Sequence, residues 1–487
     1  MIATDSNPVL SEFEWLLRAA KAPKFRTMRQ FAEQEIIIPD GPFRGQRFRT
    51  DRQPFAGLWF DLAADSRYNR RFALGCTQSG KSLCAFVIPC LYHLFEIGET
   101  VICGLPDMDM AADKWREDLL PALEKTRYRE LVPSKGAGSR GGRPVAFQFS
   151  SGATLKFMSG GGGDKSRAGF TSRVVVVTEV DGLDLAGEAS READKFTQIE
   201  ARTLAYGEQK QIYGECTVSI EAGRIWSEHQ AGTGTEPHLK CPHCHQFVRL
   251  EREHLVGWQN ATTEAEAAEM AQWSCPKCGE LWSETDRKQA NRGAIALHRG
   301  QAVDGGGHIT GELPRTRTLS FRWHAAHNFF YDAAYVGVEE WKASRAVDEE
   351  NAEKKQRQFL FSLPHVPAAV EAAPLTAHGI QTRIVPLPRG MVPADTEYLT
   401  IGCDLGKWLC HWILLAFRAN GQIHVVDYGR IEVPSDQFGE QRAILSALQQ
   451  LKELAETGWL HQDAPPGQQQ RQPDEVWIDA GYQGEVV

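Results

Sequence analysis

The sequence of residues 75–82 is Gly75-Cys76-Thr77-Gln78-Ser79-Gly80-Lys81-Ser82. It fits the phosphate-loop pattern Gly-x-x-x-x-Gly-Lys-Ser/Thr at every fixed position. In such a loop, backbone N–H groups surround the phosphates, the lysine reaches the β- and γ-phosphate oxygens, and the final hydroxyl binds Mg²⁺. An apolar strand-like segment precedes it at 71–74, and an apolar helical segment follows at 81–97. The eight residues therefore predict a site for ATP and Mg²⁺, with Ser82 as the metal ligand.

A valine-rich strand that ends in acids supplies the second half of such a site. Four valines at 174–177 precede Thr178, Glu179 and Asp181. The usual pair here is Asp-Glu, because one carboxylate holds the Mg²⁺ shell while the other polarises the attacking water. Thr178 stands where the Asp is expected, so we predict Glu179 as the hydrolytic acid. On the metal side two alternatives stay open: Thr178 acting through a metal-bound water, or Asp181 supplying the missing charge.

Two arginines, Arg167 and Arg173, flank the same strand. Either could neutralise charge on the γ-phosphate, within this chain or toward a neighbouring subunit. The alternative is a surface arginine, since most arginines lie at protein surfaces. The sequence does not decide between these roles.

Strands and helices alternate between about residues 70 and 220, which predicts a mostly parallel α/β sheet. The length of 487 residues predicts two or three domains. No run of about 18 apolar residues and no signal-peptide pattern occurs, so we expect a cytoplasmic protein without a membrane span. The formal net charge is −9, so any contact with DNA must be a local basic patch.

Four of the eleven cysteines form two Cys-Pro-x-Cys knuckles, at Cys241 and Cys244 and at Cys275 and Cys278. Four thiolates suit tetrahedral zinc with no open position, which predicts a structural zinc ribbon at 237–285. A Glu- and Ala-rich helix is expected between the knuckles at about 260–272. His243 and His245 are rival ligands, and 241–245 also fits the haem-attachment pattern, but the second matching knuckle favours zinc.

A second unit begins after a proline-rich segment at 364–394, which reads as a linker. Residues 399–406 predict a strand that ends at Asp404, and residues 476–481 predict another that ends at Asp479. Two strand-end carboxylates on neighbouring strands are what a two-metal phosphodiester cleavage site needs. Asp before Gly is also ordinary turn chemistry, and spacing alone leaves that alternative open.

Together these residues resemble the large subunit of bacteriophage terminases of the lambda-like, gpA type. The resemblance covers most of the chain, and the order of the segments carries it more than any single segment. The segments, in chain order, are Arg49–Phe55, GCTQSGKS, VVVVTEVDGLD, Gly223–Trp226, the two knuckles, Leu319–His324, IGCDLG and VWIDAGYQG.

The resemblance implies an N-terminal P-loop ATPase, at 1–363 with the zinc ribbon inserted, that pumps double-stranded DNA into a preformed capsid. It implies a ribonuclease-H-like α/β nuclease at 395–487 that cuts concatemeric DNA. The partners it implies are a small terminase subunit, the portal protein and further copies of the chain in a ring. Its location would be the cytoplasm of the host bacterium.

Site residues follow from the same resemblance. Gln53 and Phe55 would lie near the adenine, and Glu179 would be the hydrolytic acid. Cys216-Thr217 falls where the family has the segment that couples hydrolysis to movement, often with Ser or Thr in place of Cys216. Thr178 departs from the family's Asp, which leaves the holding of the metal open.

For the nuclease, the resemblance implies Mg²⁺ or Mn²⁺ held by Asp404 and Asp479. A third acid and further elements would follow in the family, whereas the sequence ends at Val487, so we expect an incomplete nuclease domain. Asp427 is a candidate for the third ligand, but its position in a strand is unsuitable for that role. Two rival functions are a helicase-like, nucleic-acid-dependent ATPase without nuclease activity and a non-enzymatic zinc adaptor with a decayed phosphate loop.

Overall fold

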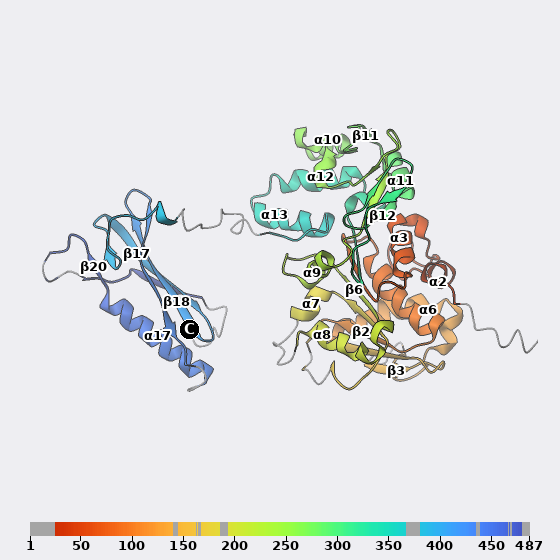
Figure 1. Ribbon diagram of the computed structural model, residues 1–487, viewed down its shortest axis with the longest axis horizontal. Coiled ribbons are helices and arrows are strands. Elements are labelled where there is room, and N and C mark those ends of the chain that lie inside the picture. Colours follow the sequence, from red (N-terminus) through yellow and green to blue (C-terminus); the bar gives the residue numbers. More distant parts are fainter. Residues whose placement is uncertain are drawn as a thin grey trace, which may run out of the picture. The chain divides into compact units, whose positions relative to one another are not determined.

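The computed structural model describes residues 25–139, 145–161, 163, 167–185, 193–366, 380–434, 439–465, 467 and 470–479. The chain forms two compact units, Met1–Ala372 and Ala373–Val487, and each is described by itself (Figure 1). Within the described residues, no helix combines the length and apolar character that crossing a membrane requires.

The first unit is built on a seven-stranded sheet in the order β15-β1-β6-β5-β2-β4-β3. All neighbours are parallel except the hairpin of β3 and β4. This confirms the predicted α/β fold with a mostly parallel sheet. The strands are β1 (Arg70–Gly75), β2 (Val101–Leu105), β3 (Ala146–Gln148), β4 (Thr154–Ser159), β5 (Val174–Thr178), β6 (Gln211–Cys216) and β15 (Thr318–Trp323).

The valines of β5 explain why this sheet is covered on both faces. Val174 and Val176 belong to one hydrophobic core, and Val175 and Val177 belong to another on the opposite face. A strand whose alternate side chains are all apolar must be buried on both sides, as parallel strands usually are. Helices on the two faces provide that cover (Figure 1).

The helix after the phosphate loop runs through η2 (Leu83–Val87), α4 (Ile88–Leu91) and η3 (Tyr92–Ile97). Gly98 ends it with φ +79°, a left-handed conformation that glycine adopts without a steric penalty. The other helices of this part are α2 (Met28–Glu35), η1 (Thr50–Arg52), α3 (Pro54–Ala63), α5 (Met108–Asp113), η4 (Lys114–Leu119), α6 (Leu120–Glu124), η5 (Arg127–Leu131), α7 (Val180–Leu185), α8 (Lys195–Glu200), η7 (Ala201–Gln209) and α9 (Arg224–Ala231).

An insertion of small sheets and helices lies between α9 and β15 in the sequence. Each knuckle sits in a short antiparallel ladder, β7 with β8 and β10 with β11, and α10 lies between them where a helix was predicted. The elements are β7 (Glu236–Lys240), β8 (Phe247–Val248), η8 (Arg252–His254), β9 (Leu255–Val256), η9 (Trp258–Asn260), α10 (Glu264–Met270), β10 (Gln272–Ser274), β11 (Leu281–Trp282), α11 (Glu284–Arg292), β12 (Ile295–Leu297), β13 (Ala302–Val303) and β14 (Ile309–Thr310).

After β15 the chain returns to the phosphate loop. It forms η10 (Ala325–His327), α12 (Ala333–Ala343), α13 (Glu349–Lys355) and η11 (Gln356–Leu360). Side chains of α12 and η11 share a hydrophobic core with the knuckles. The insertion is therefore packed against the segment that follows β15.

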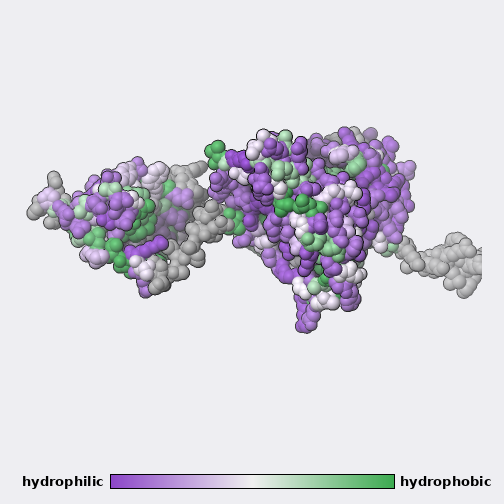
Figure 2. Space-filling model, turned by 90° about the horizontal axis from the view of Figure 1, so that it is seen from above, coloured by the Kyte–Doolittle hydropathy of each residue, from purple (hydrophilic) through white to green (hydrophobic). Residues whose placement is uncertain are grey.

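The second unit has a four-stranded sheet in the order β19-β18-β17-β22 and a small sheet of β16, β20 and β21. Helix α17 packs Ala443, Ile444 and Leu451 on one face of the larger sheet. The large hydrophobic side chains exposed on its strands include Tyr398, Ile413, Phe417, Tyr428 and Trp477. Figure 2 shows hydrophobic residues among hydrophilic ones on the visible face of this unit.

One hairpin of this unit is formed by two ten-residue strands joined at Gly421, which has φ +79°. The elements are β16 (Met391–Val392), β17 (Thr396–Leu405), β18 (Leu409–Arg418), β19 (Ile423–Glu432), α17 (Glu440–Thr457), β20 (Trp459–His461), β21 (Gln470–Arg471) and β22 (Glu475–Ile478).

Candidate functional site

The phosphate loop begins where β1 ends, and two of its residues must be glycine. A Cβ on Gly75 would lie 2.4 Å from the indole carbons of Trp323, so the buried ring leaves no room for a side chain. Gly80 has φ +85° and open space around its Cα, which is where glycine is favoured and a phosphate can approach. Gln78 adopts φ +53°, an uncommon conformation for a residue with a side chain.

Hydrogen bonds from residues distant in the sequence fix the conformation of the phosphate loop. The indole Nε1 of Trp323 donates to Ser79 Oγ at 3.0 Å, and Ser79 Oγ donates to the carbonyl of Cys76 at 2.7 Å. Tyr331 Oη donates to the carbonyl of Thr77 at 2.6 Å, and the Thr77 N–H donates to the carbonyl of Phe359 at 2.9 Å. The loop is therefore preorganised by β15 and by the segment that follows it.

A carboxylate on β6 lies at the centre of the site. Glu215 is fully buried and forms an ion pair with the Lys81 ammonium group. Ser82 Oγ donates to Glu215 Oε1 at 2.9 Å, and Thr178 Oγ1 donates to the same oxygen. The phosphate loop and the end of β5 are thus joined through one acid that no sequence motif indicates.

Burial opposes the charged forms of Lys81 and Glu215, but their mutual attraction outweighs it. The pKa of Lys81 is held above its usual value by Glu215 and, less strongly, by Glu179. The pKa of Glu215 is held below its usual value by Lys81 and by the hydroxyls of Thr178 and Ser82. Both groups are therefore charged at neutral pH, and removing one partner of such a buried pair costs about 3–5 kcal/mol.

Glu179 follows β5 directly and has φ +50°. Strained backbone of this kind costs on the order of 1–3 kcal/mol for a residue with a side chain, and it persists where the surroundings fix it. Its Oε2 accepts a hydrogen bond from the Cys216 thiol at 3.4 Å. The predicted hydrolytic acid thus touches the predicted coupling segment and lies close enough to Lys81 to raise that residue's pKa.

The structure does not bring Asp181 to the phosphate loop. Its Oδ1 accepts from the N–H of Ile225 at 2.8 Å, and its Oδ2 accepts from Ser219 Oγ. The side chain is buried and holds the start of α9. Asp181 therefore does not supply the charge that is missing at Thr178, because the turn at Glu179 directs α7 toward α9.

The two residues predicted near the adenine are buried beside the phosphate loop. Gln53 Nε2 donates to Asn328 Oδ1 at 2.6 Å, and Gln53 Oε1 accepts from the N–H of Phe329 at 3.0 Å. Phe55 stacks on Trp323 with the ring centroids 4.5 Å apart. In this conformation both residues contact side chains that lie next to the phosphate loop, and their contact with a base stays a prediction.

Neither flanking arginine is a free surface residue. Arg167 is 2% exposed, and it donates to Gln198 Oε1 and to the carbonyls of Ser159 and Gly160. Arg173 pairs with Glu99 at 2.6 Å, at the end of β5 opposite to Thr178. Arg173 therefore lies at the wrong edge of the sheet for a phosphate bound in this chain.

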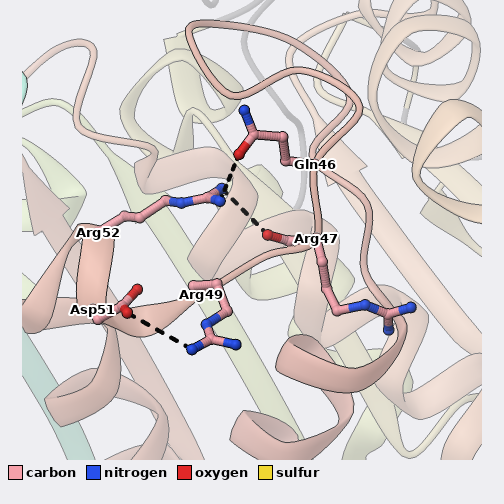
Figure 3. A pocket seen from close by; sticks show the side chains of 5 residues that line it. All are labelled: Gln46, Arg47, Arg49, Asp51 and Arg52. Carbon is pink, nitrogen blue, oxygen red and sulfur yellow. Dashed lines mark hydrogen bonds and ion pairs between the residues drawn. The ribbon is translucent and has the colours of Figure 1, made fainter.

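A local basic surface exists despite the negative net charge. A hollow of about 440 Å³ is lined by Gln46, Arg47, Arg49, Asp51 and Arg52. Figure 3 shows these five side chains. Arg52 donates to Gln46 Oε1 at 2.6 Å and to the carbonyl of Arg47 at 3.2 Å, and its guanidinium lies 4.3 Å from the centroid of the Phe43 ring. A neighbouring hollow adds two more cations, Lys288 and Arg292.

The four knuckle cysteines converge as a metal site requires. Their Sγ atoms all lie within 4.8 Å of one another, and the Cys241–Cys278 and Cys244–Cys275 pairs are 3.9 Å apart. Tetrahedral zinc with Zn–S bonds of ~2.3 Å places its sulfurs about 3.8 Å apart, so this arrangement fits zinc. His243 Nε2 lies instead 3.7 Å from a carboxylate oxygen of Asp286.

Asp404 and Asp479 lie at the ends of neighbouring parallel strands. Cys403 pairs with Ile478, and the N–H of Asp479 donates to the carbonyl of Cys403 at 2.9 Å. Both acids are exposed. Asp427 is committed elsewhere, since it accepts from Trp459 Nε1 at 2.9 Å and pairs with Arg389 at 2.7 Å. Among the described residues, the four cysteines form the only group of three or more potential ligands close enough to share an ion.

Comparison with known proteins gives one family and several structural neighbours. The family model described as "Phage terminase large subunit gpA, ATPase domain" matches residues 44–299, more than half of the chain. The large terminase of bacteriophage HK97 is 12% identical, with 84% of this chain and 68% of that chain covered and a TM-score of 0.41.

Two further neighbours are also phage large terminases. The large terminase of a thermophilic bacteriophage is 11% identical, covers 91% of this chain and 79% of its own, and has a TM-score of 0.34. The large terminase ATPase domain of Thermus phage P74-26 is 13% identical, covers 68% of this chain and 100% of its own, and has a TM-score of 0.33. No curated protein matches the chain.

Proposed function

The chain belongs to the gpA family of phage terminase large subunits, and from that premise we propose that it hydrolyses ATP to drive double-stranded viral DNA into a procapsid. The observation that carries the proposal is the buried cluster in which Lys81 and Ser82 of the phosphate loop meet Thr178 and Glu215, with Glu179 beside it. A cluster of this kind provides a cation for phosphate oxygens, a hydroxyl for Mg²⁺ and a carboxylate for water.

In this proposal each residue has one task. Bound ATP with Mg²⁺ supplies a γ-phosphoryl group that water can attack. Lys81 exchanges Glu215 for the β- and γ-phosphate oxygens, and the Ser82 hydroxyl binds the metal ion. Glu179 orients the attacking water and accepts its proton. The contact between Cys216 and Glu179 transmits the effect of ATP hydrolysis to β6 and to Thr217, the residue that follows this strand.

DNA binding by an acidic chain needs a local basic surface, and the arginine-lined hollow is our candidate for it. Phosphate contacts of this kind hold DNA without reading its sequence, which suits a packaging motor. The zinc ribbon is proposed as a structural element, because four thiolates leave no coordination position open for substrate.

We further propose that the C-terminal unit is a ribonuclease-H-like nuclease in which Asp404 and Asp479 hold Mg²⁺ or Mn²⁺ for endonucleolytic cutting of concatemers. Support comes from their positions on adjacent parallel strands. The proposed domains are 1–363 and 395–487, joined by 364–394. The proposed partners are a small terminase subunit, the portal protein and other copies of the chain in a ring, in the cytoplasm of the host.

The test is ATP turnover with and without linear duplex DNA, for wild type, Lys81→Ala and Glu179→Ala. We expect DNA-stimulated turnover in the wild type and its loss in both variants. Unchanged turnover in Lys81→Ala would contradict the proposal and favour the zinc-adaptor alternative. Strand separation of duplex DNA without cleavage, in a buffer that contains Mg²⁺, would favour the helicase-like alternative.

A further inference from the structure

We propose that Glu215, on β6, supplies the metal-side carboxylate that position 178 lacks, and that it passes from Lys81 to the Mg²⁺ shell when ATP binds. The inference rests on the proposed ATPase function and assigns the residue that completes it. Glu215 acts through Ser82 and metal-bound water, so it is a positioning residue.

The strand register accounts for the exchange of roles. Thr178 and Glu215 are direct partners in the parallel pair of β5 and β6, so they stand at the same level of the sheet. Glu215 is also the partner of Ala73 in β1, the strand that leads into the phosphate loop. Moving the acid from β5 to β6 shifts it by one strand spacing, about 4.8 Å, toward Lys81.

The two carboxylate oxygens of Glu215 have different partners, which suits an acid that holds a metal ion. Its Oε1 accepts from the hydroxyls of Ser82 and Thr178, while its Oε2 pairs with Lys81. Ser82 is the residue whose hydroxyl binds Mg²⁺ in a phosphate loop. A serine hydroxyl next to a carboxylate oxygen is the kind of oxygen donor set that Mg²⁺ selects, usually through retained waters.

The two other acids near the site are not available for this role. Asp181 is bonded to Ser219 and to the start of α9. Glu179 lies beyond the end of β5 and accepts from Cys216, and the proposed function already assigns it to the attacking water. Glu215 is therefore the acid that contacts both Lys81 and Ser82.

Burial favours the exchange. Glu215 has no solvent-exposed surface, so its carboxylate needs either a cation or a proton when Lys81 leaves it. Mg²⁺ arrives with the nucleotide and is the cation that replaces Lys81 in this proposal. ATP without metal should therefore bind poorly, because Lys81 would have to leave Glu215 uncompensated.

The experiment measures the affinity of ATPγS by calorimetry in Mg²⁺ and in EDTA, which does not depend on turnover. In the wild type, Mg²⁺ should strengthen binding. In Glu215→Gln the strengthening should fall by ~10- to 100-fold, as for other groups that orient metal ligands. Adding Thr178→Asp to Glu215→Gln should restore it. Glu179→Gln, the matched control, should keep the full Mg²⁺ dependence.

A full Mg²⁺ effect in folded Glu215→Gln would overturn the inference and leave the ATPase proposal intact. Failure of the wild type to bind nucleotide in either buffer would instead remove the ATPase proposal. Should Glu215→Gln not fold, Glu215→Asp keeps the charge but withdraws it by one methylene, and it should weaken the Mg²⁺ effect at least about threefold. An unchanged effect in that variant would also overturn the inference.

Discussion

The proposed ATP site and the C-terminal acids both lie at the ends of parallel strands, yet their surroundings are opposite. At the proposed ATP site, Lys81 and Glu215 are buried and paired with each other, and Glu215 also accepts hydrogen bonds from Ser82 and Thr178. Asp404 and Asp479 are exposed, and no third potential ligand among the described residues joins them. A preorganised buried site commits its groups to one chemistry, whereas two exposed carboxylates do not yet define a metal geometry.

The largest effect should come from Glu179→Gln. We expect kcat for ATP hydrolysis to fall by about 10²- to 10⁴-fold, the usual contribution of a general base, while nucleotide still binds. A phosphate-release assay and ATPγS titration measure the two quantities. The matched change in the other region, Asp404→Asn, should leave ATP turnover unaltered. Equal loss in both variants would erase the distinction between the two sites.

Trp323→Ala should strongly destabilise the first unit. Trp323 is fully buried over Gly75 and also bonds Ser79, so truncation leaves a cavity beside the phosphate loop and costs about 3–5 kcal/mol. Calorimetry should show the transition of the first unit lowered and that of the second unit unmoved.

The control is Trp477→Ala in the second unit. Trp477 is 66% exposed, so we expect its loss to change stability by no more than about 0.5 kcal/mol. A large effect of Trp477→Ala would mean that this side chain is covered in solution. A small effect of Trp323→Ala would mean that the ring does not support the phosphate loop.

Short sequence motifs predicted those parts of the molecule whose residues lie close together in the sequence. The phosphate loop, the buried strand at 174–177 and the two knuckles are recognisable because their chemistry sits within a few consecutive positions. The parallel α/β sheet followed from the alternation of strands and helices and is confirmed.

Glu215 could not be identified in this way, because its role depends on strand order. It matters only because β6 lies between β1 and β5, which no local pattern states. Its one sequence signal is an acid that follows Ile212 and Tyr213 in a largely apolar strand, where burial requires a partner for the charge. Asp181 shows the converse, since it stands two residues from Glu179 but is turned toward α9.

Asp404→Asn should weaken Mn²⁺ binding to the protein on the order of tenfold, or about 1.4 kcal/mol, if the two acids share an ion. Asp479→Asn should have the same effect, because the two strands place both acids at one edge. Manganese paramagnetic resonance in the absence of nucleotide separates this site from the ATP site.

The control is Asp463→Asn, an exposed acid between β20 and β21 that should leave Mn²⁺ binding unaltered. Equal losses in all three variants would indicate non-specific attraction by surface charge rather than a shared site.

The smallest effect should come from the arginine-lined hollow. Arg49 and Asp51 are both largely exposed, and their charged groups lie 3.9 Å apart. An exposed ion pair of this kind contributes little, so Arg49→Gln should not change stability measurably. If the hollow binds DNA phosphate, the slope of log affinity against log salt should fall by about 1 in this variant. Titration of a labelled duplex at several salt concentrations measures the slope.

The control is Lys452→Gln, which removes a charge from α17, because the ammonium group of Lys452 faces Glu456 on the surface of that helix. An unchanged slope for Arg49→Gln would place the DNA contact elsewhere on the chain, and the ATP site would then have to be coupled to DNA through another surface.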